Sequence, residues 1–246
     1  MFVLLGVVEG GCAASGGNEV VRVAVASNFT SVQETLAARF TAETGIPVES
    51  SYGATGALYS QIAHGAPFAI LLAADAERPA RLETEGAAVA GSRFTYALGA
   101  LVLFGPDGME GGAGALRAGA FTRLAICKPE LAPYGAAARQ ALERLVGWDA
   151  VAPKLVLGDN VTQTYQFVAT GSAELGFVAL SQVLDRPASH YWRVPDDLYD
   201  PIRQDAVLLR AGAGSDGARR YLVFLQSPEA RGIIEAAGYR VPEPAR

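Results

Sequence analysis

Histidine, cysteine and lysine are all scarce in this chain of 246 residues. It contains two His, two Cys and two Lys, so that arginine supplies nearly all of its 20 basic side chains. Two cysteines cannot build a disulfide framework or a cysteine-based zinc site. With only His64 and His190, far apart in sequence, histidine-rich metal catalysis is disfavoured. Basic runs and aromatic stacking platforms are missing too, and the net charge is −5, which argues against a nucleic-acid partner.

Apolar residues, by contrast, are plentiful at 50%, which indicates a folded chain of one large domain or two small lobes. The N-terminal run Met1–Val8 is apolar, but it is shorter than the roughly 20 residues that span a bilayer. It is typical of the end of an export signal. Gly10-Gly11-Cys12-Ala13 resembles a bacterial lipoprotein cleavage site, although Glu9 is unusual there. We expect residues 1–19 to be a signal remnant and tether, and the protein to be periplasmic or otherwise extracytoplasmic. Cys12 is either lipidated or part of a plain signal peptide.

Strand-like and helix-like segments alternate from residue 20 onward, and this rhythm predicts an α/β fold with mainly parallel sheets. The expected elements include a strand at 20–26, a helix at 31–44, strands at 47–52 and 68–73, a long apolar strand at 96–104 and a returning strand at 206–209. We predict two lobes with two strands crossing between them and a ligand cleft at the joint. The first lobe comprises 20–100 plus 196–246, and the second comprises 101–195.

Several residues that could suggest chemistry have a simpler structural explanation. Gly212-Ala-Gly214-Ser-Asp-Gly217 matches a dinucleotide-binding pattern, but no strand of a βαβ unit is expected after it, so we interpret it as a loop that caps a helix. The chain has no nucleophile elbow, Walker A sequence or zinc-protease motif. His64 ends a predicted helix. Cys127 lies in an apolar strand and is expected to be a buried, unreactive thiol.

Four predicted helices begin with short polar or small residues directly after a strand or loop. These starts are Ser27-Asn28-Phe29-Thr30, Gly53-Ala54-Thr55-Gly56, Ala132-Pro133-Tyr134-Gly135 and Gly158-Asp159-Asn160-Val161-Thr162. Ligands of open α/β sheets bind at the carboxyl ends of the strands, where helix N-termini offer unpaired N–H groups and a positive dipole end. Any one start is an ordinary helix cap. The set of four, two from each lobe, predicts an anion site.

The chain also resembles a known family through motifs in order along nearly its whole mature length. These include Ala24-Val-Ala-Ser-Asn-Phe-Thr30, Ser51-Tyr-Gly-Ala-Thr-Gly56, Ala73-Ala-Asp75, Pro133-Tyr-Gly135 and Leu175-Gly-Phe-Val-Ala-Leu-Ser-Gln182. They are similar to the molybdate-binding proteins of bacterial ABC importers. The resemblance implies a type II periplasmic-binding-protein fold, no enzymatic activity, no cofactor, a monomer, and delivery of molybdate or tungstate to a membrane permease with a cytoplasmic ATPase. It places the ligand contacts on Ser27, Asn28, Thr55, Tyr134 and, through its backbone N–H, Val161. Ala179 stands where some members have a contacting tyrosine.

The residue types favour an anion that carries no proton. Ser27, Asn28, Thr55 and Tyr134 can all donate hydrogen bonds, whereas hydrogen phosphate would also require an acceptor, for which Asp159 is the nearest acidic residue in sequence. A sulfate- or thiosulfate-binding protein is the alternative, because only cavity size separates these anions. A hydrolase with Ser27 or Thr55 as nucleophile lacks a nearby His or Lys base. The choice between molybdate and tungstate, the affinity and the identity of the permease stay open.

Overall fold

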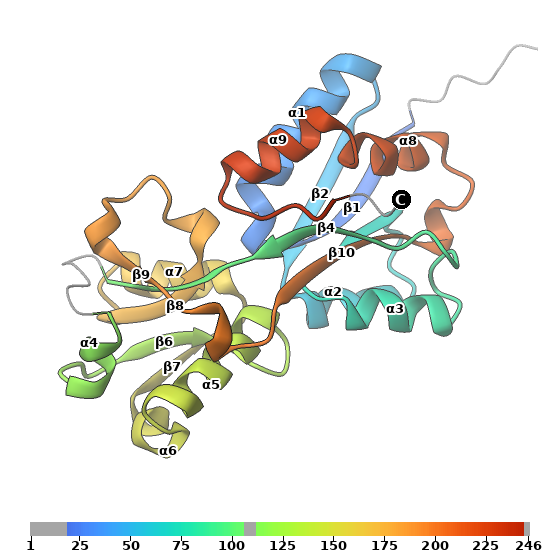
Figure 1. The fold of residues 1–246 in the computed structure, drawn as a ribbon. Helices are drawn as coiled ribbons and strands as arrows, with labels where there is room; N and C mark the ends of the chain where they lie inside the picture. The colour runs from blue at the N-terminus through green and yellow to red at the C-terminus, as the bar shows by residue number, and fades with distance from the viewer. Residues whose placement is uncertain (1–18, 106–111, 244–246) are drawn as a thin grey trace, which may run out of the picture.

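The computed structural model describes residues 19–105 and 112–243. The predictions for the export signal and Cys12, and most of the loop expected at 106–114, therefore lie outside the described residues. Within the described residues the strands form two sheets of five strands each, and helices cover both (Figure 1). The α/β fold with two lobes is confirmed.

The first sheet has the strand order β2-β1-β3-β10-β4. Its strands are β1 (Val21–Ala26), β2 (Val48–Gly53), β3 (Ile70–Leu72), β4 (Phe94–Gly99) and β10 (Ile202–Leu208). β1 runs parallel to β2 and β3, and β10 is antiparallel to both of its neighbours. On one face lie α1 (Thr30–Thr44), α8 (Asp216–Leu225) and α9 (Pro228–Ala236), and on the other lie α2 (Thr55–Ala63) and α3 (Glu77–Thr84) (Figure 1).

The second sheet repeats this plan with the order β7-β6-β8-β5-β9. Its strands are β5 (Leu101–Phe104), β6 (Leu124–Cys127), β7 (Leu155–Gly158), β8 (Leu175–Ala179) and β9 (Tyr191–Arg193). β5 is the reversed strand here. The helices of this lobe are α4 (Ala113–Ala118), α5 (Pro133–Leu145), α6 (Trp148–Val151) and α7 (Val161–Ala169). Across the two described stretches, no helix combines the length and apolar composition that crossing a bilayer demands.

The chain passes between the sheets twice, and the two passages differ in structure. The first is nearly a single strand, because β4 and β5 are separated only by Ala100. The return from β9 to β10 contains a short 3-10 helix, Asp196–Leu198, instead of a crossing strand. Tyr199 after this turn is buried in the core of the second lobe. The predicted lobe boundaries remain a prediction, and the packing of Tyr199 favours a return to the first lobe nearer Ile202 than residue 196.

Local sequence explains why these elements form where they do. β1 reads Val-Arg-Val-Ala-Val-Ala, and only Arg22 is exposed, as expected for a strand covered by helices on both faces. α1 ends at Gly45, whose φ of 73° is the left-handed conformation that glycine adopts without strain. Ser215 caps α8 through its side chain, so the glycine-rich segment before it is a helix cap and not a dinucleotide loop. Cys127 is buried, and desolvation raises its thiol pKa to about 12, as the sequence predicts for an unreactive thiol.

Gly135 allows the N-terminus of α5 to approach the end of β6. A Cβ atom at this position would lie inside contact distance of the Cys127 carbonyl oxygen. The preceding residue, Tyr134, is one of the predicted site residues, so this close approach sets the position of part of the site.

We therefore expect Gly135→Ala to lower the free energy of unfolding by about 1–3 kcal/mol, since backbone and helix must shift to relieve the overlap. The measurement is denaturant unfolding followed by circular dichroism. Gly232→Ala is the matched control: Gly232 is exposed within α9 and a Cβ there meets no atom within 4 Å, so its higher helix propensity should stabilise the protein by roughly 0.5–1 kcal/mol. Equal effects of the two substitutions would contradict the packing argument.

Candidate functional site

A small cavity lies where the carboxyl ends of strands from both sheets meet. Its volume is about 10 Å³, roughly the space that one ordered water requires and far below the roughly 300–1,000 Å³ that is usual for organic ligands. The five residues predicted from the sequence all line it: Ser27, Asn28, Thr55, Tyr134 and Val161. The other lining residues are Ala26, Gly53, Ala54, Ala74, Ala132 and Pro133. Among the described residues that line this cavity, none carries a charge.

The helix starts that were predicted from the sequence converge on this cavity. Ser27 and Asn28 open a 3-10 turn that runs directly into α1, and Thr55 is the first residue of α2. Tyr134 follows Pro133 at the start of α5, and Val161 is the first residue of α7. The N–H groups of a first helical turn have no acceptor within their helix. Backbone donors from two elements of each lobe are therefore available at the cavity.

Two hydroxyl groups add to these backbone donors. Ser27 is 6% exposed and Thr55 is 1% exposed. The Thr55 Oγ1 accepts a hydrogen bond of 3.0 Å from the backbone N–H of Ala74, which leaves the hydroxyl proton of Thr55 to be donated elsewhere. The geometry suits an acceptor-rich ligand, because every polar group brought to the cavity by these residues can donate.

The side-chain amide of Asn28 donates to other residues and not toward the cavity, which differs from the role that the sequence suggested for it. The Asn28 amide nitrogen donates to Gln204 Oε1 and to the Tyr239 hydroxyl, each at 3.0 Å, which uses both of its protons. The Tyr134 hydroxyl accepts from Gln204 Nε2 at 3.3 Å. Asn28 therefore has its backbone N–H to offer as a donor at the cavity, whereas Tyr134 has its backbone N–H and a hydroxyl proton that this bond does not use.

Sequence reasoning missed a buried polar cluster behind the cavity, made of Gln204, Tyr96, Tyr239 and Ser181. Gln204 Oε1 accepts from Asn28 and also from the Tyr96 hydroxyl. Tyr239 bonds to Asn28 and to Ser181. Gln204 and Tyr239 lie 176 and 211 residues from Asn28 in the chain, so no local motif could have revealed the cluster.

Burial keeps the tyrosine hydroxyls of this region protonated. Desolvation raises the pKa of Tyr134 well above its usual value. It also raises the pKa of Tyr239 to about 12, although hydrogen bonds from neighbouring side chains oppose this shift. Both phenols therefore stay protonated and uncharged at neutral pH.

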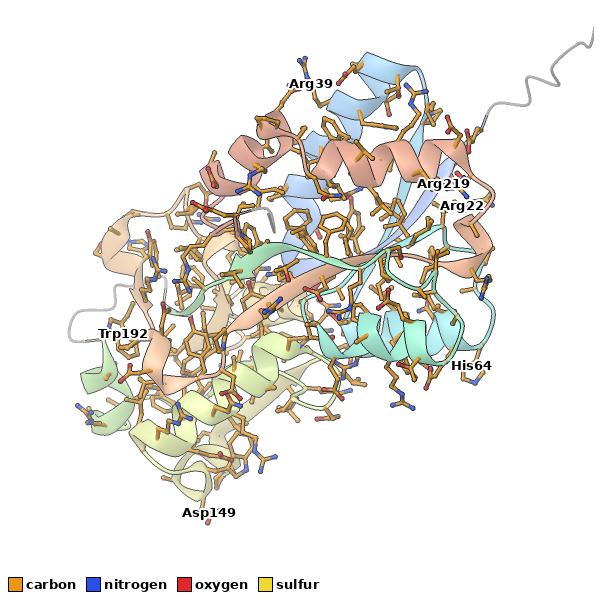
Figure 2. All side chains as sticks on the ribbon, turned by 45° about the vertical axis from the view of Figure 1, so that its right-hand side comes forward. Arg22, Arg39, His64, Asp149, Trp192 and Arg219 are labelled. Carbon is orange, nitrogen blue, oxygen red and sulfur yellow. The ribbon has the colours of Figure 1, made fainter. Side chains whose placement is uncertain are left out.

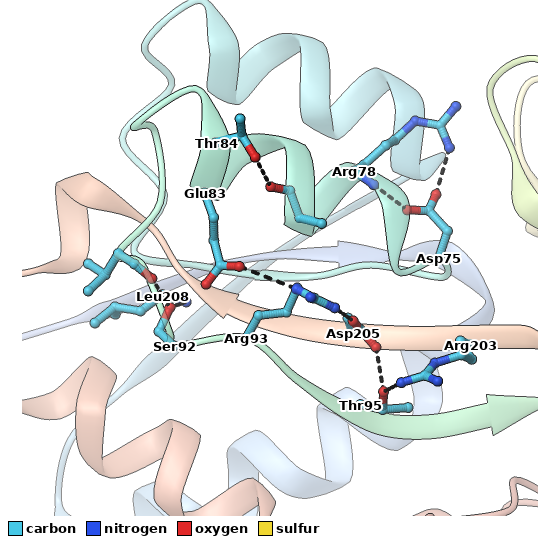
Figure 3. Close-up of polar contacts among 12 residues, drawn as sticks. Asp75, Arg78, Glu83, Thr84, Ser92, Arg93, Thr95, Arg203, Asp205 and Leu208 are labelled. Atoms are coloured by element: carbon cyan, nitrogen blue, oxygen red, sulfur yellow. Dashed lines mark hydrogen bonds and ion pairs between the residues drawn. The ribbon is translucent and has the colours of Figure 1, made fainter.

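Charged residues lie near the cavity but outside it. Asp159, the acidic residue nearest in sequence to the predicted contacts, is 67% exposed and paired with Lys128 at 2.6 Å. Asp75 forms an ion pair with Arg78 at 2.6 Å (Figure 3). The Arg78 guanidinium also donates to the Glu130 carbonyl of the second lobe at 2.9 Å. The remaining candidate, His64, is exposed at the end of α2, on the surface of the first lobe (Figure 2).

The two lobes are in direct contact around the cavity. Gly56 N donates to the Leu131 carbonyl at 2.8 Å. Thr162 Oγ1 donates to the Ser27 carbonyl, and Ser181 Oγ donates to the Asn28 carbonyl, both at 3.1 Å. Each of these bonds joins one lobe to the other, so the structure represents a closed arrangement of the lobes.

Comparison with known proteins agrees with this architecture. Residues 21–240 match the family model described as "Bacterial extracellular solute-binding protein". The chain is 48% identical over 244 residues to the Molybdate-binding protein ModA of Azotobacter vinelandii, covering 97% of this chain and 96% of the relative. It is 45% identical over 236 residues to that of Rhodobacter capsulatus, covering 96% and 93%. The solved structure of the Azotobacter vinelandii periplasmic molybdate-binding protein superimposes with a TM-score of 0.86 at 37% identity, covering 91% of this chain and all of that one.

Proposed function

The chain belongs to the bacterial extracellular solute-binding protein family, and from its site and its relatives we propose that it captures molybdate outside the cytoplasm for an ABC importer. It is a binding protein and not an enzyme. The observation that carries the proposal is the small uncharged cavity at which helix N-termini of both lobes meet. The protein needs no cofactor to bind this ligand, because the metal of molybdate is already surrounded by four oxygen atoms.

The donors that we assign to the anion are of two kinds. Hydroxyl groups come from Ser27 and Thr55, and backbone N–H groups come from Asn28, Thr55, Tyr134 and Val161. Hydrogen bonds to a charged partner are worth roughly 1.5–3 kcal/mol each. Several converging bonds therefore hold a desolvated dianion without a counter-charge, and the positive ends of the helix dipoles act in the same direction.

None of these assigned groups is a carboxylate, which favours a fully deprotonated tetrahedral anion over hydrogen phosphate. Tungstate has the same charge and shape as molybdate, and we propose that it binds as well. Closure of the two lobes around the ion buries it. We further propose that the protein acts as a monomer and passes its cargo to a membrane permease that is driven by a cytoplasmic ATPase. Attachment through Cys12 remains a prediction, because Cys12 lies outside the described residues.

The proposed ligand predicts which anions stabilise the protein. A ligand that binds only the folded state raises the free energy of unfolding by RT ln(1 + [L]/Kd), which is about 2.7 kcal/mol at 100 times Kd. In a thermal-shift titration at constant ionic strength, molybdate and tungstate should raise Tm, and sulfate and phosphate should not at equal concentration. Stabilisation by sulfate or phosphate alone would overturn the assignment.

The two hydroxyl groups provide a direct test of the site. Ser27→Ala combined with Thr55→Ala should weaken molybdate binding roughly 100-fold or more, since two bonds to a charged ligand are lost. Isothermal titration calorimetry measures the change. The control is Ser60→Ala combined with Thr84→Ala, which removes two exposed hydroxyls of the same lobe and should leave Kd unchanged. If the site variant bound as tightly as the wild type, the donor assignment would be wrong.

The affinity for molybdate should not change between pH 7 and pH 9. Backbone N–H groups and aliphatic hydroxyls do not titrate in this range, and burial raises the pKa of Tyr134 and Tyr239 above it. The measurement is Kd at several pH values and fixed ionic strength. A titration midpoint within this interval would reveal an ionisable group on the ligand or in the site, and would contradict a set of neutral donors that holds a proton-free anion.

A further inference from the structure

The last described residues form a short segment that touches both lobes; we name residues 238–240 the C-terminal strap. The strap pairs with β4 next to the first passage between the lobes, since Leu98 N donates to the Arg240 carbonyl at 2.7 Å and Arg240 N donates to the Leu98 carbonyl at 3.1 Å. On its other side, Gly238 has a φ of 87°, and a Cβ atom there would lie 2.8 Å from Leu184 Cδ1 of the second lobe. The strap therefore lies against the first passage between the lobes and contacts both lobes.

Tyr239, in the middle of the strap, directs its hydroxyl into the region behind the cavity. This hydroxyl donates to the Asn28 carbonyl at 2.8 Å and accepts from the Asn28 amide at 3.0 Å. It also lies 2.9 Å from Ser181 Oγ. Tyr239 is 5% exposed, so these bonds form where water does not compete with them.

Ser181 belongs to the second lobe, directly after β8, whereas Asn28 belongs to the first. The Asn28 carbonyl accepts from both Ser181 Oγ and the Tyr239 hydroxyl. A rotation of the second lobe away from the first carries Ser181 with it and breaks its bonds to Asn28 and Tyr239. Asn28 is also one of the residues that we assign to the anion, so the same small group of bonds connects lobe closure to the shape of the site.

We propose that Tyr239 is a positioning residue, whose hydroxyl orients Asn28 and, through Ser181, holds the lobes closed over the bound anion. Tyr239 is not among the residues that line the cavity. Its effect is on the lifetime of the closed complex. The inference rests on the proposed function, because it assumes that Asn28 contributes to an oxyanion site.

The test is Tyr239→Phe, measured by stopped-flow dissociation of the bound anion. The ring keeps its edge-on contact with Phe29, at 5.3 Å between centroids, and the Asn28 carbonyl keeps Ser181 as a partner, so the variant should fold. We expect the dissociation rate to rise about five- to tenfold with little change in the association rate, because the one hydrogen bond of Tyr239 that joins the lobes, to Ser181, is lost.

Tyr221→Phe is the matched control. Tyr221 is also buried, and its hydroxyl donates to Gln33 within the first lobe at 2.8 Å. It should lose comparable stability and dissociate the anion at the wild-type rate. If the two tyrosine variants changed the dissociation rate equally, or if Tyr239→Phe left it unchanged, the strap would have only a structural role and the proposal would be overturned.

Ser181→Ala gives a second test from the opposite lobe. It should also speed dissociation, and Tyr239→Phe should have no further effect in the Ser181→Ala background, because Ser181 is the partner through which the Tyr239 hydroxyl reaches the second lobe. Additive effects would overturn the proposal. If the wild-type protein binds sulfate or phosphate in place of molybdate, the proposed function fails, and the same rate comparison with that anion still decides the role of Tyr239.

Discussion

The proposed site depends on one electrostatic requirement, which is to bury a doubly charged ion without a charged partner. An unpaired charge inside a protein is costly unless hydrogen bonds replace its hydration shell. At this cavity those bonds must come from groups that carry only partial charges, so several of them have to converge on one small volume. Helix N-termini meet this requirement because each presents N–H groups that the helix itself cannot use. Two lobes are required, since the helices of one sheet approach the ion from one side only.

This requirement explains the small residues around the cavity. Ala26, Ala54 and Ala74 of the first lobe belong to the same buried cluster as Ala132 and Tyr134 of the second, so apolar packing is continuous across the joint. Larger side chains at these alanine positions would separate the helix starts from each other. Gly135 has the corresponding role beneath α5. Packing, and not the polar groups alone, therefore determines how closely the donors approach.

The site could be predicted from sequence as far as it is encoded locally. Consecutive residues such as Ser27-Asn28 or Gly53-Ala54-Thr55 are enough to predict a helix start. The alternation of strands and helices along the chain then places these starts at one edge of each sheet. The Asn28 side chain was predicted to donate to the ligand, but in the structure it donates to Gln204 and Tyr239. These partners come from distant segments, so the sequence around Asn28 does not reveal them. The 3-10 turn in the return passage was also missed, since residues 194–201 carry no strong periodic pattern. The sequence alone does not show which of several possible partners a polar side chain bonds to once folding has brought them together.

An acidic protein can bind an anion, because the repulsion from its net charge and the attraction of the donors at the site act over different distances. The net charge of −5 acts through solvent, where salt screens it beyond about 8 Å at physiological ionic strength. The donors at the cavity act at hydrogen-bond distance in a region that the closed lobes shield from water. The same arrangement explains release. A permanent positive charge would still attract the ion after the lobes separate, whereas neutral donors lose most of their effect once half of them move away. In the proposed mechanism, the lobes control affinity by bringing together, or separating, two incomplete half-sites.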